Sequence, residues 1–113
     1  MNETRTHTVL VVEDDEMNRE ILEEMLSEYY FVITAKDGLE ALDFIKYLER
    51  SENLHLIISD LRMPKMSGIE LLEQAKHIVP HAKRILLTGC TDTSVMIEAV
   101  NRAHVYKYIE KLI

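Results

Sequence analysis

The stretch TVLVVEDDE, residues 8–16, decides the fold, because an apolar run passes directly into four acidic residues. A second stretch, LIISDLRMP at residues 56–64, repeats this pattern and places Asp60 directly after its apolar run. Such continuous apolar runs are typical of strands buried on both faces of a parallel sheet. Ligand sites of open α/β sheets lie outside the carboxyl ends of the strands, so neighbouring strands would bring these acids together. Because clustered carboxylates repel one another unless a metal ion or shifted pKa values relieve them, we expect a small divalent-metal site with one aspartate free for chemistry.

The composition is that of one soluble globular domain. The chain has 113 residues, of which 47% are hydrophobic and 29% charged, enough to bury a single core. Its net charge of −7 would repel a phosphate backbone or an anionic bilayer, so we expect neither nucleic-acid nor membrane binding. No secretory signal is visible, no apolar run approaches the roughly 20 residues that cross a bilayer, and the lone cysteine, Cys90, suits the cytosol. A cytoplasmic location is expected.

Apolar runs alternate with helix-periodic segments along the chain, which is the pattern of a doubly wound, three-layer α/β sandwich with a five-stranded parallel sheet. We expect the strands near Thr8–Val12, Phe31–Ala35, Leu56–Ser59, Arg84–Thr88 and Val105–Ile109. Only four residues follow the fifth predicted strand, too few for a fifth helix. Part of one sheet face should therefore expose apolar surface, which a further segment or a partner would have to cover.

Four amphipathic helices are expected between the strands. The first spans about Met17–Glu28, and the second begins near Gly38 and extends as far as Arg50. The third begins near Gly68 and must end before Pro80, and the fourth follows an N-cap at Asp92 or Thr93. The predicted inward stripes are Met17, Ile21, Leu22, Met25 and Leu26; Leu39, Leu42, Ile45 and Leu48; Ile69, Leu72 and Ala75; and Val95, Met96, Ala99 and Val100.

Four segments, each at the end of a predicted strand, resemble those of the receiver domain of two-component response regulators. They are VVED at 11–14, SDLRMPKMSG at 59–68, LLTG at 86–89 and YIEK at 108–111. One such segment alone is a weak signal, but four in order are specific. The resemblance covers residues 1–113 as one receiver domain and implies the flavodoxin-like strand order 2-1-3-4-5. It also indicates the N-terminal part of a larger response regulator with an output domain.

The resemblance implies that Asp60 accepts a phosphoryl group from a sensor histidine kinase or a phosphotransfer protein. Carboxylates are competent phosphoryl acceptors, and such a transfer depends on positioning and charge neutralisation. Glu13, Asp14, Asp60 and the backbone carbonyl of Arg62 would hold Mg²⁺, for which Mn²⁺ can substitute. The domain would then be a signalling switch and not a turnover enzyme, since it would catalyse only its own phosphoryl transfer and dephosphorylation.

The same resemblance assigns roles to residues after the fourth and fifth strands. Lys111 would contact a phosphate oxygen, and the hydroxyl of Thr88 would hydrogen-bond the new phosphoryl group. The inward movement of Thr88 would let Tyr108 change rotamer, which switches the surface formed by the fourth strand, the fourth helix and the fifth strand. Arg62 and Cys90 occupy positions that tune phosphoryl lifetime, and they predict intermediate-to-slow dephosphorylation that Arg62→Asn should accelerate.

Departures and simpler interpretations leave alternatives open. Leu112 stands where the family has a proline in a cis bond, and a cis bond there would cost about 3 kcal/mol. The chain could therefore be a phosphorylation-independent pseudo-receiver, or a homodimer through its uncovered face. An aspartate-nucleophile phosphatase is disfavoured, because the chain has no cap insertion. Taken singly, the residues have ordinary readings: Asp15 as a helix cap, Thr88 as a strand residue, Tyr108 in the core, and the five histidines at the surface.

Overall fold

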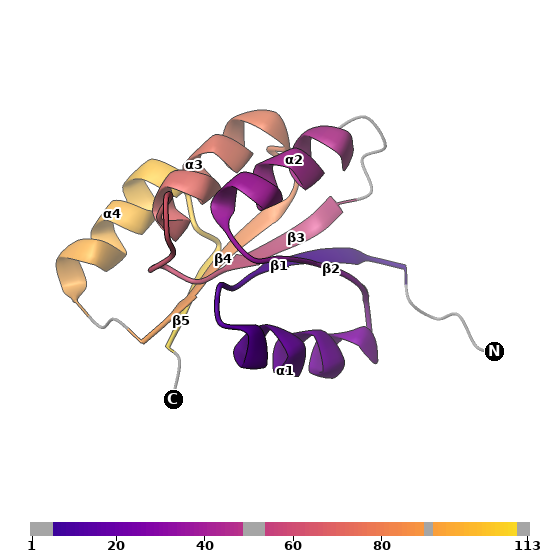
Figure 1. The fold of residues 1–113 in the computed structure, drawn as a ribbon. Helices are drawn as coiled ribbons and strands as arrows, with labels where there is room; N and C mark the ends of the chain where they lie inside the picture. Colours follow the sequence, from indigo (N-terminus) through magenta and orange to yellow (C-terminus); the bar gives the residue numbers. More distant parts are fainter. Residues whose placement is uncertain (1–5, 49–53, 90–91, 111–113) are drawn as a thin grey trace.

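The computed structural model describes residues 6–48, 54–89 and 92–110, which form a three-layer α/β sandwich (Figure 1). Five parallel strands make one sheet in the order β2-β1-β3-β4-β5, which confirms the predicted topology. The strands are β1 (Thr8–Val12), β2 (Phe31–Ala35), β3 (Leu54–Ser59), β4 (Lys83–Thr88) and β5 (Lys107–Glu110). The helices are α1 (Glu16–Ser27), α2 (Gly38–Leu48), α3 (Gly68–Ile78) and α4 (Thr93–Ala103).

The strand ends agree with the sequence pattern except at β5, where the prediction begins two residues too early. His104 closes α4 with a left-handed backbone (φ 48°), and the chain then turns back toward the sheet. The Tyr106 N–H donates to the carbonyl of Arg84 at 2.7 Å, and ladder pairing with β4 begins only at Lys107. The reversal at His104 therefore uses the residues that the apolar pattern assigned to the strand.

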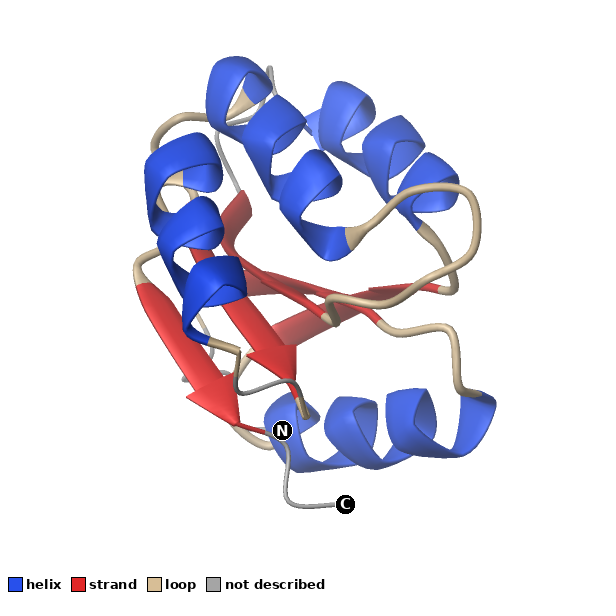
Figure 2. Ribbon diagram, turned by 90° about the vertical axis from the view of Figure 1, so that its left-hand side faces the viewer, coloured by secondary structure: helices blue, strands red, loops and turns tan. Residues whose placement is uncertain are grey.

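Helices α2, α3 and α4 cover one face of the sheet, and α1 lies by itself on the other (Figures 1 and 2). The covered face holds the main core, in which Leu10, Ile57 and Leu86 are fully buried. Helix α3 is the middle one of the three and contacts both α2 and α4. Its predicted stripe of Ile69, Leu72 and Ala75 is buried and confirmed. The central helix is thus the best-packed helix of the domain.

The inward stripe predicted for α1 is wrong at three of its five positions. Met17, Ile21 and Met25 are 70%, 47% and 62% exposed, and α1 has no fully buried residue. Leu22 and Leu26 are half-buried instead. Helix α1 packs on β1 and β2 and meets no other helix among the described residues, so only a narrow ridge of it is covered. The prediction of a partly bare sheet face is confirmed: Ile109 of β5 is 40% exposed.

The outer two helices of the covered face are also more exposed than their patterns predict. Leu39 of α2 and both Met96 and Val100 of α4 are exposed, because each of these helices has a helix neighbour on one side only. Burial there falls to Leu42 and Ile45 in α2 and to Ala99 in α4, with Val95 half-buried. The Leu48 side chain and the expected extension to Arg50 lie outside the described residues.

None of the helices in the described ranges has the length and apolar character needed to cross a membrane.

Candidate metal centre

The sheet itself brings the acidic residues of β1 and β3 together. Val12 and Ser59 are partners in the ladder between these two strands, so Glu13 and Asp60 leave the sheet side by side. The Asp60 N–H donates to the Val12 carbonyl at 3.1 Å, and the Glu13 N–H donates to the Ala35 carbonyl of β2 at 3.1 Å. Main-chain pairing therefore sets the position of both acids before any side-chain contact is made.

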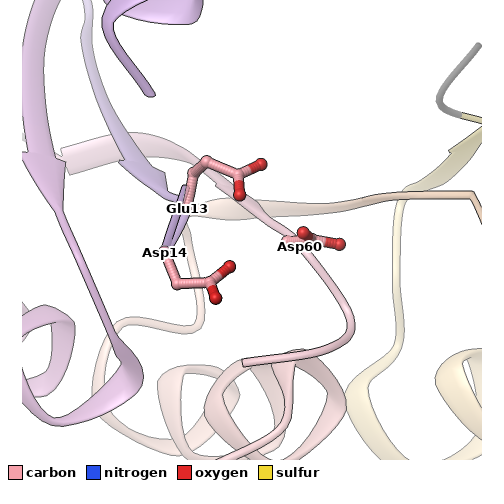
Figure 3. Close-up of side chains that lie close together, drawn as sticks. All are labelled: Glu13, Asp14 and Asp60. Carbon is pink, nitrogen blue, oxygen red and sulfur yellow. The ribbon is translucent and has the colours of Figure 1, made fainter. Parts of the chain in front are cut away.

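Glu13, Asp14 and Asp60 form one acidic cluster at the carboxyl end of the strands (Figure 3). Each contributes one carboxylate oxygen, and these three oxygens lie within 4.8 Å of one another. Glu13 is buried (1% exposed), Asp60 is half-buried and Asp14 is exposed. Hard oxygen donors that are open to water on one side match the preference of Mg²⁺, which retains several waters. The donor set therefore fits the ion expected from the sequence.

Backbone amides hold two of the carboxylates in place. Asp60 Oδ1 accepts a hydrogen bond from the Leu61 N–H at 2.7 Å, and Glu13 Oε2 accepts one from the Asp15 N–H at 3.1 Å. Asp15 itself caps α1 by accepting a hydrogen bond from the Asn18 N–H at 2.9 Å, which confirms the structural role expected for it. These contacts reduce the number of rotamers the acids can adopt, so the cluster is partly preorganised.

The loop from β3 to α3 wraps closely around Asp60, and this requires a glycine at position 68. A Cβ built on Gly68 would lie 2.0 Å from the backbone oxygen of Asp60, while the Gly68 N–H donates to the Leu61 carbonyl at 2.8 Å. Ser67 then caps α3 through a reciprocal pair of hydrogen bonds with Glu70, and the Ser67 N–H lowers the pKa of that carboxyl. The sequence marked Gly68 as a helix start but not as a point of close backbone approach.

Thr88 and Tyr108 both belong to the covered side of the sheet. Thr88 ends β4 and is 2% exposed. Tyr108 is half-buried, pairs with Leu86 in the ladder and packs against the main core. Arg62 is exposed just after Asp60. Lys111, Leu112 and Cys90 lie outside the described residues, so the roles expected for them stay predictions.

One buried cation, Arg84, was not singled out from the sequence. Its side chain is 9% exposed and donates to the carbonyls of Ala82 and Ala103, each at 2.8 Å, with longer contacts to Pro80 and His104. Burial lowers the pKa of the guanidinium. Arg84 thus ties β4 to the last turn of α4, where a cation also complements the helix dipole. Its only sequence signal is a cation inside the otherwise apolar run of β4.

Comparison with known proteins agrees with this geometry. Residues 9–113 match the model of the response regulator receiver domain. Over 104 residues the chain is 35% identical to the hydrogenase transcriptional regulatory protein HoxA of Cupriavidus necator, covering 92% of this chain and 21% of that protein. The chain thus spans about a fifth of the length of this relative.

Two solved structures carry the same fold. A CheY-like receiver domain protein from Methanospirillum hungatei superimposes with a TM-score of 0.85 at 30% identity, covering 95% of this chain and 82% of that one. The response regulator TrrA of Thermotoga maritima, solved in complex with Mg²⁺ and BeF, gives a TM-score of 0.77 at 34% identity over 93% and 86% of the two chains. The chain belongs to the family of response regulator receiver domains.

Proposed function

We propose that this domain is a phosphorylatable switch in which Asp60 accepts a phosphoryl group from the phosphohistidine of a sensor kinase or phosphotransfer protein. The observation that carries the proposal is the acidic cluster of Glu13, Asp14 and Asp60 at the carboxyl end of β1 and β3. In the transfer, an Asp60 carboxylate oxygen attacks phosphorus, the P–N bond breaks, and the histidine imidazole leaves. The product is an acyl phosphate on Asp60.

Glu13, Asp14, Asp60 and the carbonyl of Arg62 are the proposed Mg²⁺ ligands, with Mn²⁺ as a substitute. When bound, this ion supplies neutralisation of the negative charge that gathers on the acids and the incoming phosphoryl oxygens. The protein holds Asp60 toward the phosphoryl donor through the Leu61 N–H and keeps Glu13 buried at the floor of the cluster. The relative TrrA, solved with Mg²⁺ and BeF, supports this assignment by similarity.

Lys111 and Thr88 are proposed to bind the new phosphoryl oxygens, and Tyr108 is proposed to report the change to the β4–α4–β5 surface. Thr88 and Tyr108 lie on neighbouring strands and on the same side of the sheet as α4, which suits a coupled movement. We further propose slow-to-intermediate loss of the phosphoryl group, set by Arg62 and Cys90. The signal would pass in the cytoplasm to an output module of a longer parent chain, or to a second copy through the uncovered face.

The experiment that tests this proposal is intact-mass measurement after incubation with acetyl phosphate and Mg²⁺. Wild type should gain the mass of one phosphoryl group, and Asp60→Asn should gain none. Asp43→Asn, which changes an exposed aspartate of α2, is the matched control and should behave as wild type. No gain in wild type would instead favour a pseudo-receiver that binds partners without phosphorylation.

A further inference from the structure

A second pocket lies at the amino ends of the strands, at the opposite edge of the sheet from the acidic cluster. Its volume is about 320 Å³, and it is lined by three histidines that are far apart in sequence, His7, His55 and His81. Lys83 and Tyr30 complete the polar lining, and Val9 and Leu56 supply apolar surface. A pocket of this size and mixed character is large enough for a small organic molecule.

The ring of His55 has a defined hydrogen-bonding role. The register between β1 and β3 shifts so that Thr8 pairs with Leu54 and Val9 with Leu56, which leaves His55 as the extra residue of a bulge. His55 Nδ1 accepts a hydrogen bond from the Thr8 N–H at 3.1 Å. Because a backbone N–H can only donate, Nδ1 carries no proton, and the proton of the neutral ring is on Nε2. The free edge of His55 is therefore a donor.

This arrangement disfavours a transition metal in the pocket. A metal bound to His55 Nε2 would shift the ring proton to Nδ1, where it would oppose the Thr8 N–H. Lys83 would also repel a cation, and in the described part of the chain only Glu13, Asp14 and Asp60 form a group of three or more His, Cys, Asp or Glu residues close enough to share an ion. The pocket is thus unsuited to a cation.

Its charge is suited to an anion. No carboxylate lines the pocket, although the chain as a whole carries a net charge of −7. The Lys83 Nζ lies 4.3 Å from the centre of the Tyr106 ring, a contact that leaves its charge in place, and it forms no ion pair with a described carboxylate. The other polar groups can all donate: the Tyr30 hydroxyl, the Nε2–H of His55, and at least one N–H of each remaining imidazole.

We propose that this pocket binds a small organic anion, a carboxylate on an aromatic or similarly compact apolar body. The carboxylate would meet Lys83 and the imidazole N–H groups, and the apolar body would lie against Val9 and Leu56. The paired rings of His7 and His55, 4.6 Å apart between centroids in an edge-to-face arrangement, offer a further surface for an aromatic ring. This site is independent of phosphorylation at Asp60.

The test is a titration of the whole chain with benzoate, followed through the imidazole Cε1–H resonances in NMR spectra. His7, His55 and His81 should shift saturably, while the exposed His77 and His104, which lie outside the pocket, serve as internal references and should not. Lys83→Met should weaken binding about tenfold, as expected for loss of a charge-assisted hydrogen bond. Tyr30→Phe should weaken it less, and Lys46→Met, at an exposed site on α2, should leave it unchanged.

Two further ligands separate charge from shape. Benzyl alcohol has the same ring without the charge and should bind at least about tenfold more weakly, since it cannot pair with Lys83. Inorganic phosphate has charge without an apolar body and should also bind more weakly than benzoate. Equal binding of benzyl alcohol and benzoate, unchanged affinity in Lys83→Met, or shifts no larger at the three pocket histidines than at His77 and His104 would each overturn the proposal.

Discussion

Leu86 and Leu87 are neighbours on β4, yet they lie in different environments. Leu86 points to the side of α2, α3 and α4 and is fully buried, whereas Leu87 points to the side of α1 and is only half-buried. Ile57 and Ile58 on β3 show the same difference. One sheet therefore has a closed face that resembles the interior of a larger protein and an open face that resembles an interface.

The acidic cluster depends mainly on the closed face. Asp60 leads through its tight loop into α3, the most deeply packed helix, and Thr88 ends a strand whose core residue is Leu86. From the open face, α1 contributes the Asp15 cap and a hydrogen bond from Arg19 to the Glu13 carbonyl at 3.0 Å. The difference teaches that the site can be rigid while a large part of the opposite face is available for contact.

The largest expected effect comes from truncating the two adjacent leucines. Leu86→Ala should lower the free energy of unfolding by about 2–5 kcal/mol, because it removes buried methyl groups and leaves a cavity. Leu87→Ala should cost clearly less, about 1–2 kcal/mol, because solvent already reaches that side chain. Urea denaturation of the two variants measures the difference. Equal losses would mean that the two faces are equally packed.

The next effect concerns the loop that carries Asp60. Gly68→Ala forces a methyl group against the Asp60 backbone and should cost about 1–3 kcal/mol while reducing phosphoryl gain, since the loop must move. Gly89→Ala is the matched control, because a Cβ there meets no atom within 4 Å. Denaturation and intact-mass measurement on both variants separate the steric effect from a general effect of the added methyl group.

A smaller effect joins α3 to α4 on the closed face. Glu73 accepts a hydrogen bond from Arg102 at 2.7 Å, which lowers the pKa of this carboxyl below its ordinary value of 4.5. The ion pair therefore stabilises the fold above that ordinary value, and its contribution disappears as the pH falls through the lowered pKa of the folded state.

Glu73→Gln should thus reduce stability at neutral pH and converge with wild type in acid, as measured by urea denaturation across a pH series. The change should be modest, because exposed ion pairs contribute little. Glu24→Gln on α1, where no described ion pair is present, should give no such convergence. A constant difference at all pH values would show that the Glu73 charge is not responsible.

The smallest effect is expected on the outer surface of α1. Met17 is 70% exposed, so Met17→Gln should change the free energy of unfolding by no more than about 0.5 kcal/mol. A loss of 2 kcal/mol or more, on the order of a core truncation, would show that something covers α1 in solution. Repeating the measurement over a range of protein concentrations would then reveal self-association through the open face.

The parts of the fold that depend on local pattern could be predicted from the sequence. The runs of β1 and β2 have the predicted ends, and the caps at Asp15 and Asp92 follow from side chains that accept hydrogen bonds from the first turn. What failed depends on neighbours distant in sequence. Met17 and Leu39 belong to apolar stripes, but their exposure is set by how many helices lie beside α1 and α2.

The candidate site shows the same division. The pairing of Val12 with Ser59 follows from the strand order, so the meeting of Glu13 with Asp60 could be expected from the family resemblance. The close approach of Gly68 to Asp60 could not, because it arises from the path of the loop. The gathering of His7, His55 and His81 was also missed, since it needs a bulge in β3 and three segments that are adjacent only in space.

The central claim is that the acidic cluster is a metal-assisted phosphoryl acceptor, and the most direct test is the rate of phosphoryl gain from acetyl phosphate as Mg²⁺ is varied. The account predicts a rate that rises with Mg²⁺ and saturates. It also predicts that Glu13→Gln and Asp14→Asn need more Mg²⁺ to reach half-saturation, because each loses a carboxylate ligand. A rate in wild type that does not depend on Mg²⁺, or one that Glu13→Gln leaves unchanged, would contradict it.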